Sequence, residues 1–73
     1  VEGVTLNGAL MSKLTRREKE VAEKLASGKR QSFIANELVI SRRTVYNHVR
    51  SIREKIGAGS AFEAAVKLAI SEK

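Results

Sequence analysis

The chain has 73 residues, which suffices for one small domain, and its hydrophobic fraction of 42% is that of a folded protein. It contains no cysteine, no aspartate and one histidine, which excludes a disulfide framework and a thiolate metal site and leaves little for a metal cluster or a catalytic triad. We therefore predict no enzyme activity, no cofactor and no metal. No apolar run is long enough to cross a bilayer, and the first residues lack a secretory signal, so we expect a cytoplasmic protein.

The net charge of +6 is concentrated in the middle of the chain. Residues 29–55 carry seven basic and two acidic side chains, a net charge of +5. Residues 1–28 carry +1, and residues 56–73 are neutral. Such a concentration of positive charge is typical of a surface that binds a polyanion.

The first predicted helix follows a stretch without periodicity. Residues 1–12 contain two glycines and no repeating apolar pattern, so we predict a linker or flexible tail there. Thr15 followed three residues later by Glu18 is the pattern of a capping box, which marks a helix start. Gly28 supplies a C-terminal stop, and the helix is predicted at about 16–27.

Two further helices follow with a very short connection between them. The apolar spacing predicts a helix at about 31–38 and a longer one at about 42–56. Ser41 is a good N-cap for the longer helix, and Gly57 ends it. So short a connection favours a steep crossing of the two helices, which is the helix-turn-helix arrangement.

A fourth helix completes the predicted domain. Ser60 and Glu63 repeat the capping-box pattern before a helix at about 61–71. No segment alternates with period two, so we expect no sheet. The sequence thus predicts an all-α, four-helix domain over residues 13–73, with a helix-turn-helix at about 31–50.

The third predicted helix has two different faces. Its apolar face is formed by Val45, Val49, Ile52 and Ile56. The opposite face gathers the residues that we predict to read DNA bases, Arg43, Tyr46, Asn47 and Arg50. Arginine can donate two hydrogen bonds to guanine, asparagine can pair with adenine, and tyrosine can pack on a thymine methyl. Arg42 and Arg53 flank this face, and we predict that they contact phosphates.

The fourth predicted helix has more apolar residues than one small domain needs. We predict that one face closes the core; it comprises Phe62, Ala65, Val66 and Ala69. A second strip is then left over, formed by Ala61, Ala64 and Leu68. We interpret this strip as the interface of a homodimer, and its small size predicts that pairing is weak without DNA.

The order and spacing of these motifs resemble a known family. The stretches "LTRREKEV" and "IANELVISRRTVYNHVRSIREKIG", with Glu63–Ala64 after them, are similar to the LuxR-type (GerE- or FixJ-type) DNA-binding domain. The resemblance covers residues 14–70. It implies a four-helix domain whose third helix enters the DNA major groove. It also implies the C-terminal output domain of a bacterial transcription regulator, often a response regulator, behind an N-terminal regulatory domain that is not in this chain.

The resemblance also suggests roles for single residues. It places base reading on the same four residues of the third helix and adds Thr44 and Lys55 as phosphate contacts. Pairing through the fourth helix on two-fold DNA sites is a further implication. The leading hypothesis is therefore sequence-specific binding of double-stranded DNA. One alternative is a helical protein-interaction module that docks through its fourth helix and has non-specific nucleic-acid affinity. RNA binding is weaker, because Tyr46 is the only aromatic residue on the basic face.

Overall fold

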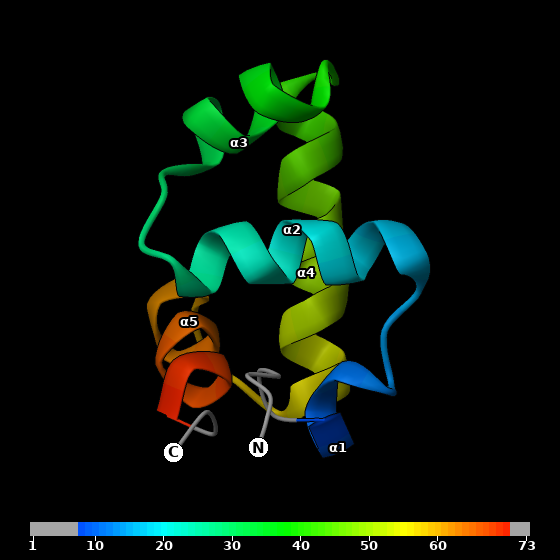
Figure 1. Ribbon diagram of the computed structural model, residues 1–73, viewed down its shortest axis with the longest axis vertical. Coiled ribbons are helices and arrows are strands. Elements are labelled where there is room, and N and C mark those ends of the chain that lie inside the picture. Colours follow the sequence, from blue (N-terminus) through cyan, green and yellow to red (C-terminus); the bar gives the residue numbers. More distant parts are fainter. Residues whose placement is uncertain (1–7, 71–73) are drawn as a thin grey trace.

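The computed structural model describes residues 8–70, and its regular elements are all helices (Figure 1). They are α1 (Gly8–Met11), α2 (Arg16–Ala26), α3 (Gln31–Leu38), α4 (Arg42–Ile56) and α5 (Ala61–Ile70). The predicted all-α class is confirmed. The four predicted helices correspond to α2, α3, α4 and α5, with ends within one residue of the expected ones. The predicted last position, residue 71, lies outside the described residues.

Side-chain caps fix where the helices begin. The Thr15 N–H donates to Glu18 Oε1 at 3.0 Å, and the Glu18 N–H donates to Thr15 Oγ1 at 3.2 Å, so the predicted capping box of α2 is present. At the start of α4, the Thr44 N–H donates to Ser41 Oγ at 3.0 Å. Gly57 ends α4 in the left-handed conformation, with φ 74°.

The long helix α4 is the axis around which the other helices are arranged (Figure 1). Helix α2 crosses α4 near its middle, α3 lies beside the N-terminal half of α4, and α5 lies towards the other end. The core between them is formed by the buried side chains Leu14, Val21, Ala22, Leu25, Ile34, Ala35, Val45, Val49, Ile52, Ile56, Ala64 and Leu68, together with Met11. The apolar face predicted for α4 is therefore the buried one.

The folded domain begins earlier than the sequence predicts. The sequence predicts a linker or tail over residues 1–12, but Gly8–Met11 forms the single-turn helix α1. Met11 belongs to the core, and Leu10 packs against it. The Leu14 N–H donates to Met11 O at 3.0 Å, which ties this turn to the start of α2. The tail prediction is therefore wrong for residues 8–12, and residues 1–7 lie outside the described part.

The two faces predicted for the fourth helix are largely exchanged in α5. Ala64 and Leu68 are fully buried, whereas Phe62 is 78% exposed and Val66 is 36% exposed. The predicted core face is therefore wrong for Phe62 and Val66, while its two alanines are half-buried. The small Ala64 side chain allows α5 to approach its neighbours closely, and Leu68 fills the core beside it. The predicted dimer strip is thus wrong for Ala64 and Leu68, which have no exposed surface to offer. The third member, Ala61, is half-buried and packs against the core.

The turn between α3 and α4 contains a strained residue. Val39 has φ 56° and ψ 48°, the left-handed conformation that a β-branched residue rarely adopts. The Ile40 N–H donates to Ala35 O at 3.0 Å, and the Val39 N–H donates to Asn36 O at 3.3 Å. These two hydrogen bonds are those of a Schellman motif. The motif ends α3 so abruptly that α4 can begin two residues after Ile40. Ser41 alone separates Ile40 from α4.

Candidate nucleic-acid interface

Helix α4 presents a continuous polar face to solvent. The four predicted base-reading residues lie on this face and are all exposed: Arg43, Tyr46, Asn47 and Arg50. The opposite side of the same helix is buried in the core. The apolar face therefore fixes the rotation of α4 about its own axis, and the polar face is held outward as a consequence.

A depression of about 570 Å³ lies where the start of α3 meets the first half of α4. It is lined by Arg30, Gln31, Ser32, Arg42, Arg43 and Tyr46, and we call it the basic depression. Arg30, the N-cap residue of α3, forms no side-chain capping bond. The first N–H groups of α3 therefore lack a capping side chain, and the start of this helix attracts anions.

Sequence reasoning did not single out the contribution of α3 to this surface. The sequence places Arg30 in the basic central segment, but its pattern does not mark Arg30, Gln31 or Ser32 as contacts. The missing cap at Arg30 was a usable signal, because a basic residue at an N-cap position does not satisfy the helix amides.

A buried carboxylate joins α2 to the C-terminal half of α4. Glu18 is only 6% exposed; its Oε1 accepts from Lys55 Nζ at 2.8 Å and its Oε2 accepts from Ser51 Oγ at 2.7 Å. Burial raises the pKa of this carboxyl, but the hydrogen bonds from Lys55, the Thr15 N–H and Ser51 outweigh it, and the pKa falls to about 2. Lys55, a predicted phosphate contact, thus has an intramolecular partner.

Arg53 also has a role within the fold. Its Nη2 donates to Gly59 O at 2.7 Å and so braces the turn between α4 and α5. Its Nε is buried and has no partner within the described residues. The phosphate contacts predicted for Arg53 and Lys55 stay predictions, and these bonds make both residues weaker candidates than the exposed Arg42.

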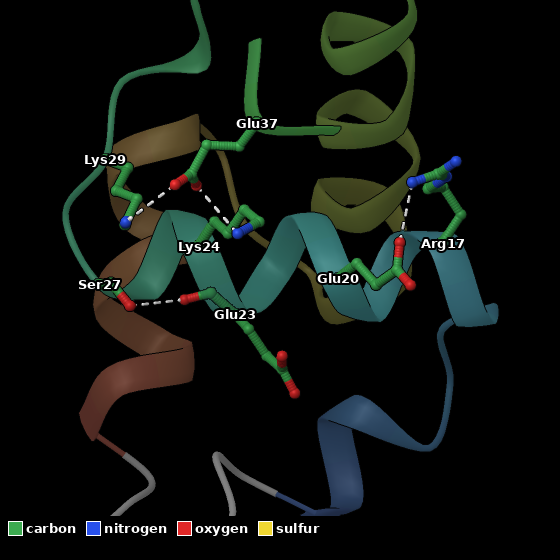
Figure 2. A network of polar contacts seen from close by, with 7 residues as sticks. All are labelled: Arg17, Glu20, Glu23, Lys24, Ser27, Lys29 and Glu37. Carbon is green, nitrogen blue, oxygen red and sulfur yellow. Dashed lines mark hydrogen bonds and ion pairs between the residues drawn. The ribbon is translucent and has the colours of Figure 1, made fainter. Parts of the chain in front are cut away.

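A further cluster of ion pairs fixes α3 against α2 (Figure 2). Glu37 of α3 lies between two lysines: its Oε1 is 2.9 Å from Lys24 Nζ, and its Oε2 is 3.6 Å from Lys29 Nζ. The hydrogen bond from Lys24 is the main cause that lowers the pKa of Glu37. Lys29 Nζ also lies 4.8 Å from the centre of the Phe33 ring. The charge of Lys29 is therefore compensated locally, unlike the charges around the basic depression.

Two other kinds of site find no support in the part of the chain that the structure describes. Residues 8–70 contain no group of three histidine, cysteine or acidic side chains that could hold a metal ion. No helix in this range is long and apolar enough to cross a membrane.

Comparison with known families shows to which family the chain belongs. The family model "Bacterial regulatory proteins, luxR family" matches residues 12–73. The chain belongs to the LuxR family. It is a LuxR-type helix-turn-helix domain of a DNA-binding transcription regulator and is not an enzyme.

Individual relatives agree with this LuxR-family assignment. Spore germination protein GerE of Bacillus subtilis is 44% identical over 55 residues, which cover 75% of this chain and 74% of GerE. Transcriptional regulatory protein UhpA of Escherichia coli is also 44% identical over 55 residues, but these are 28% of UhpA. Transcriptional regulatory protein DesR of Bacillus subtilis is 44% identical over 54 residues, 27% of its length. The domain thus spans most of GerE and less than a third of UhpA and DesR.

Proposed function

We propose that this LuxR-family domain binds duplex DNA sequence-specifically, with α4 in the major groove and two copies on a two-fold site. The observation that carries the proposal is the continuity between the exposed polar face of α4 and the basic depression. A major groove about 12 Å wide admits one α-helix. A helix placed there would bring base-reading side chains and phosphate-binding cations to the DNA together.

Base reading falls to the exposed face of α4. Arg50 can donate both terminal amino groups to O6 and N7 of guanine, and Asn47 can pair with N6 and N7 of adenine. Arg43 lies nearer the start of the helix and can reach an adjacent base pair. Tyr46, at the edge of the basic depression, can pack on a thymine methyl.

Phosphate binding falls to the rim of the same surface. Arg42, at the start of α4, and Arg30, the N-cap residue of α3, both line the basic depression, so a phosphate lying there would meet both cations. The uncapped start of α3 adds the positive end of its helix dipole. Thr44 is half-buried and its Oγ1 lies 2.9 Å from Ser41 Oγ, so it would act beside the start of α4.

In this proposal, two copies of the domain pair through the outer face of α5. Phe62, Val66 and Ile70 follow one another at intervals of four residues and are all exposed. Together they form an apolar stripe on the solvent side of a helix whose other side is in the core. Three side chains cover far less than the roughly 800 Å² per partner of a standard interface. We therefore expect little pairing in free solution and cooperative pairing on DNA.

The length of the relatives suggests the context of the domain. UhpA and DesR are named transcriptional regulatory proteins and are more than three times as long as the matching segment. We propose that this domain is likewise the output part of a longer cytoplasmic regulator with an N-terminal regulatory domain.

The direct test is selection of preferred sites from a random duplex library, followed by anisotropy titrations of variants. Arg50→Ala should weaken binding to the selected site by about 1–3 kcal/mol and relax the preference at one or two base pairs. Arg17→Ala is the matched control, because Arg17 is an exposed arginine of α2 that pairs with Glu20 at 2.9 Å. An equal loss of affinity for the selected duplex and for random DNA would show that Arg50 is a phosphate contact and not a base reader.

Pairing is tested separately on duplexes with one or two half-sites. Phe62→Ser should leave half-site binding within about twofold and should remove cooperativity on the full site, because its side chain is exposed and contributes little to the core. Unchanged cooperativity would exclude the α5 stripe from the dimer. If no duplex is preferred over random DNA, that result favours the alternative function, an interaction module that docks through α5.

A further inference from the structure

An acidic residue lies on the same face of α4 as the proposed base readers. Glu54 Oε2 is 3.6 Å from Arg50 Nε, and the two side chains are 70% and 65% exposed. At about 100° per residue, Glu54 falls between Asn47 and Arg50 around the helix axis. It lies one turn beyond Arg50, about 6 Å further along the helix.

This position is unfavourable for a purely electrostatic binder. A carboxylate on the DNA-facing side of a helix is repelled by phosphates, and an exposed ion pair of this kind adds little to the stability of the free domain. The order of the pair, with arginine before glutamate, is also the weaker one on a helix. Helix stability alone therefore does not account for Glu54.

The atom of Arg50 that Glu54 approaches suggests what Glu54 does. Glu54 approaches Nε at 3.6 Å, an ion-pair contact too long for a hydrogen bond, and this approach is not to either terminal amino group of the guanidinium. These two groups form the fork that binds O6 and N7 of guanine bidentately. A carboxylate at Nε is therefore compatible with base reading and limits the orientations of the fork.

We propose that Glu54 is a specificity-determining residue of this DNA interface, a positioning residue that orients Arg50 for a base and repels α4 from DNA that offers only phosphates. The inference rests on the proposed DNA-binding function. On cognate DNA, the favourable orientation of Arg50 towards its base offsets the repulsion between Glu54 and the phosphates. On random DNA only the repulsion acts. The ratio of cognate to random affinity therefore rises, because the complex with random DNA is weakened.

The test compares Glu54→Gln with wild type on the selected duplex and on a random-sequence duplex of equal length. Removing one negative charge should tighten random-DNA binding by up to about eightfold at 0.1 M salt and steepen its salt slope by up to about 0.9. Binding to the selected duplex should not tighten to the same extent, because the orientation of Arg50 is lost. The ratio of the two affinities should therefore fall at least about threefold.

Two further variants separate this effect from a general change in charge. Glu20→Gln also breaks an exposed arginine–glutamate pair and removes one negative charge, but from α2, and it should leave the affinity ratio unchanged. Glu54→Asp keeps the charge and should keep random-DNA affinity within about twofold of wild type.

Several results would overturn the inference. An unchanged ratio for Glu54→Gln, or an equal change for Glu20→Gln, would show that Glu54 acts only as general charge. A changed preference at one base pair, with random-DNA affinity constant, would show that Glu54 itself reads a base. If wild type prefers no duplex, the proposed function fails and this inference fails with it; if wild type discriminates and the ratio is constant, only the inference fails.

Discussion

Substitution of Glu18 should show how strongly α2 holds α4 in place. Glu18 accepts hydrogen bonds from Lys55 and Ser51 of α4 and from the Thr15 N–H at the start of α2. Glu18→Gln keeps the shape of the side chain but removes the charge and replaces one acceptor by a donor. The residue is buried, so water cannot replace the lost interactions without a rearrangement.

The pKa of Glu18 gives the size of the effect. It falls from 4.5 to about 2 on folding, so the ionised carboxylate stabilises the folded state by about 3 kcal/mol at pH 7. Because the folded-state pKa is the lower one, this contribution is complete above about pH 5 and is lost as the pH falls towards 2. At pH 3 about 1–1.5 kcal/mol should remain.

Urea unfolding followed by far-ultraviolet circular dichroism measures this dependence. The free energy of unfolding of wild type should exceed that of Glu18→Gln by about 2–3 kcal/mol at pH 7, and the difference should shrink by more than half at pH 3. Glu20→Gln serves as control, since Glu20 forms only an exposed pair and should change little at either pH. A difference for Glu18→Gln that is the same at both pH values would refute the assigned role of the carboxylate charge.

Four other outcomes follow from the same structure. Leu68→Ala should lower the free energy of unfolding by about 2–4 kcal/mol, while Phe62→Ala should change it by less than about 0.5; similar losses at both positions, measured in urea, would contradict the burial pattern of α5. Val39→Gly should raise the free energy of unfolding by about 0.5–1 kcal/mol, because it removes the left-handed strain from a side chain that is 87% exposed; a loss of stability would show that Val39 makes a needed contact. The affinity for DNA should fall with salt at a log–log slope near −3 per domain, since about three to four phosphates can be neutralised, and a slope shallower than −1 would exclude the basic depression as the main contact. Arg42→Glu should stabilise the free domain by about 0.3–1 kcal/mol through the helix dipole and should weaken DNA binding more than tenfold; tighter or equal binding in a titration would remove Arg42 from the interface.

Much of this fold could be predicted because its signals are local. The cap formed by Thr15 and Glu18 involves residues three positions apart, as does the cap formed by Ser41 and Thr44. The apolar stripes of α2 and α4 are opposed by strongly polar faces, so only one face of each helix could be buried. Local patterns of this kind leave few alternatives, and the helix ends agree with them.

Helix α5 shows where local pattern is insufficient. Only Glu63 and Lys67 interrupt its apolar residues, which cover an arc of about 240° around the axis. One small domain can cover only part of this arc, and the approach of α2 and α4 decides which part. The sequence prediction put the larger side chains inside. The structure instead buries Ala64 and Leu68, because a small residue permits close contact between helices. Helix α1 was missed for a related reason, since four residues are too few to show a period.

Which basic side chains of the central segment are available to DNA is likewise decided only by the three-dimensional structure. Lys55 pairs with Glu18, which is 37 positions away in the sequence, and Lys29 pairs with Glu37. No count of charges along the chain separates such structural lysines from cations that remain available to DNA. The structure leaves the available ones around the basic depression, at the start of α3 and in the first half of α4.

The placement of those cations contradicts what a helix prefers on its own. The first turn of α4 contains no acidic residue and begins with Arg42 and Arg43, although the positive end of the helix dipole disfavours basic side chains there. The last turn carries Arg53 and Lys55, where the dipole favours them and where both also bond within the fold. A local rule broken at one end and obeyed at the other indicates that the first end serves binding. The stretch of α4 from Arg42 to about Arg50 is therefore the part that we expect to enter the groove, and the last turn, with Arg53 and Lys55, is the part that anchors the helix.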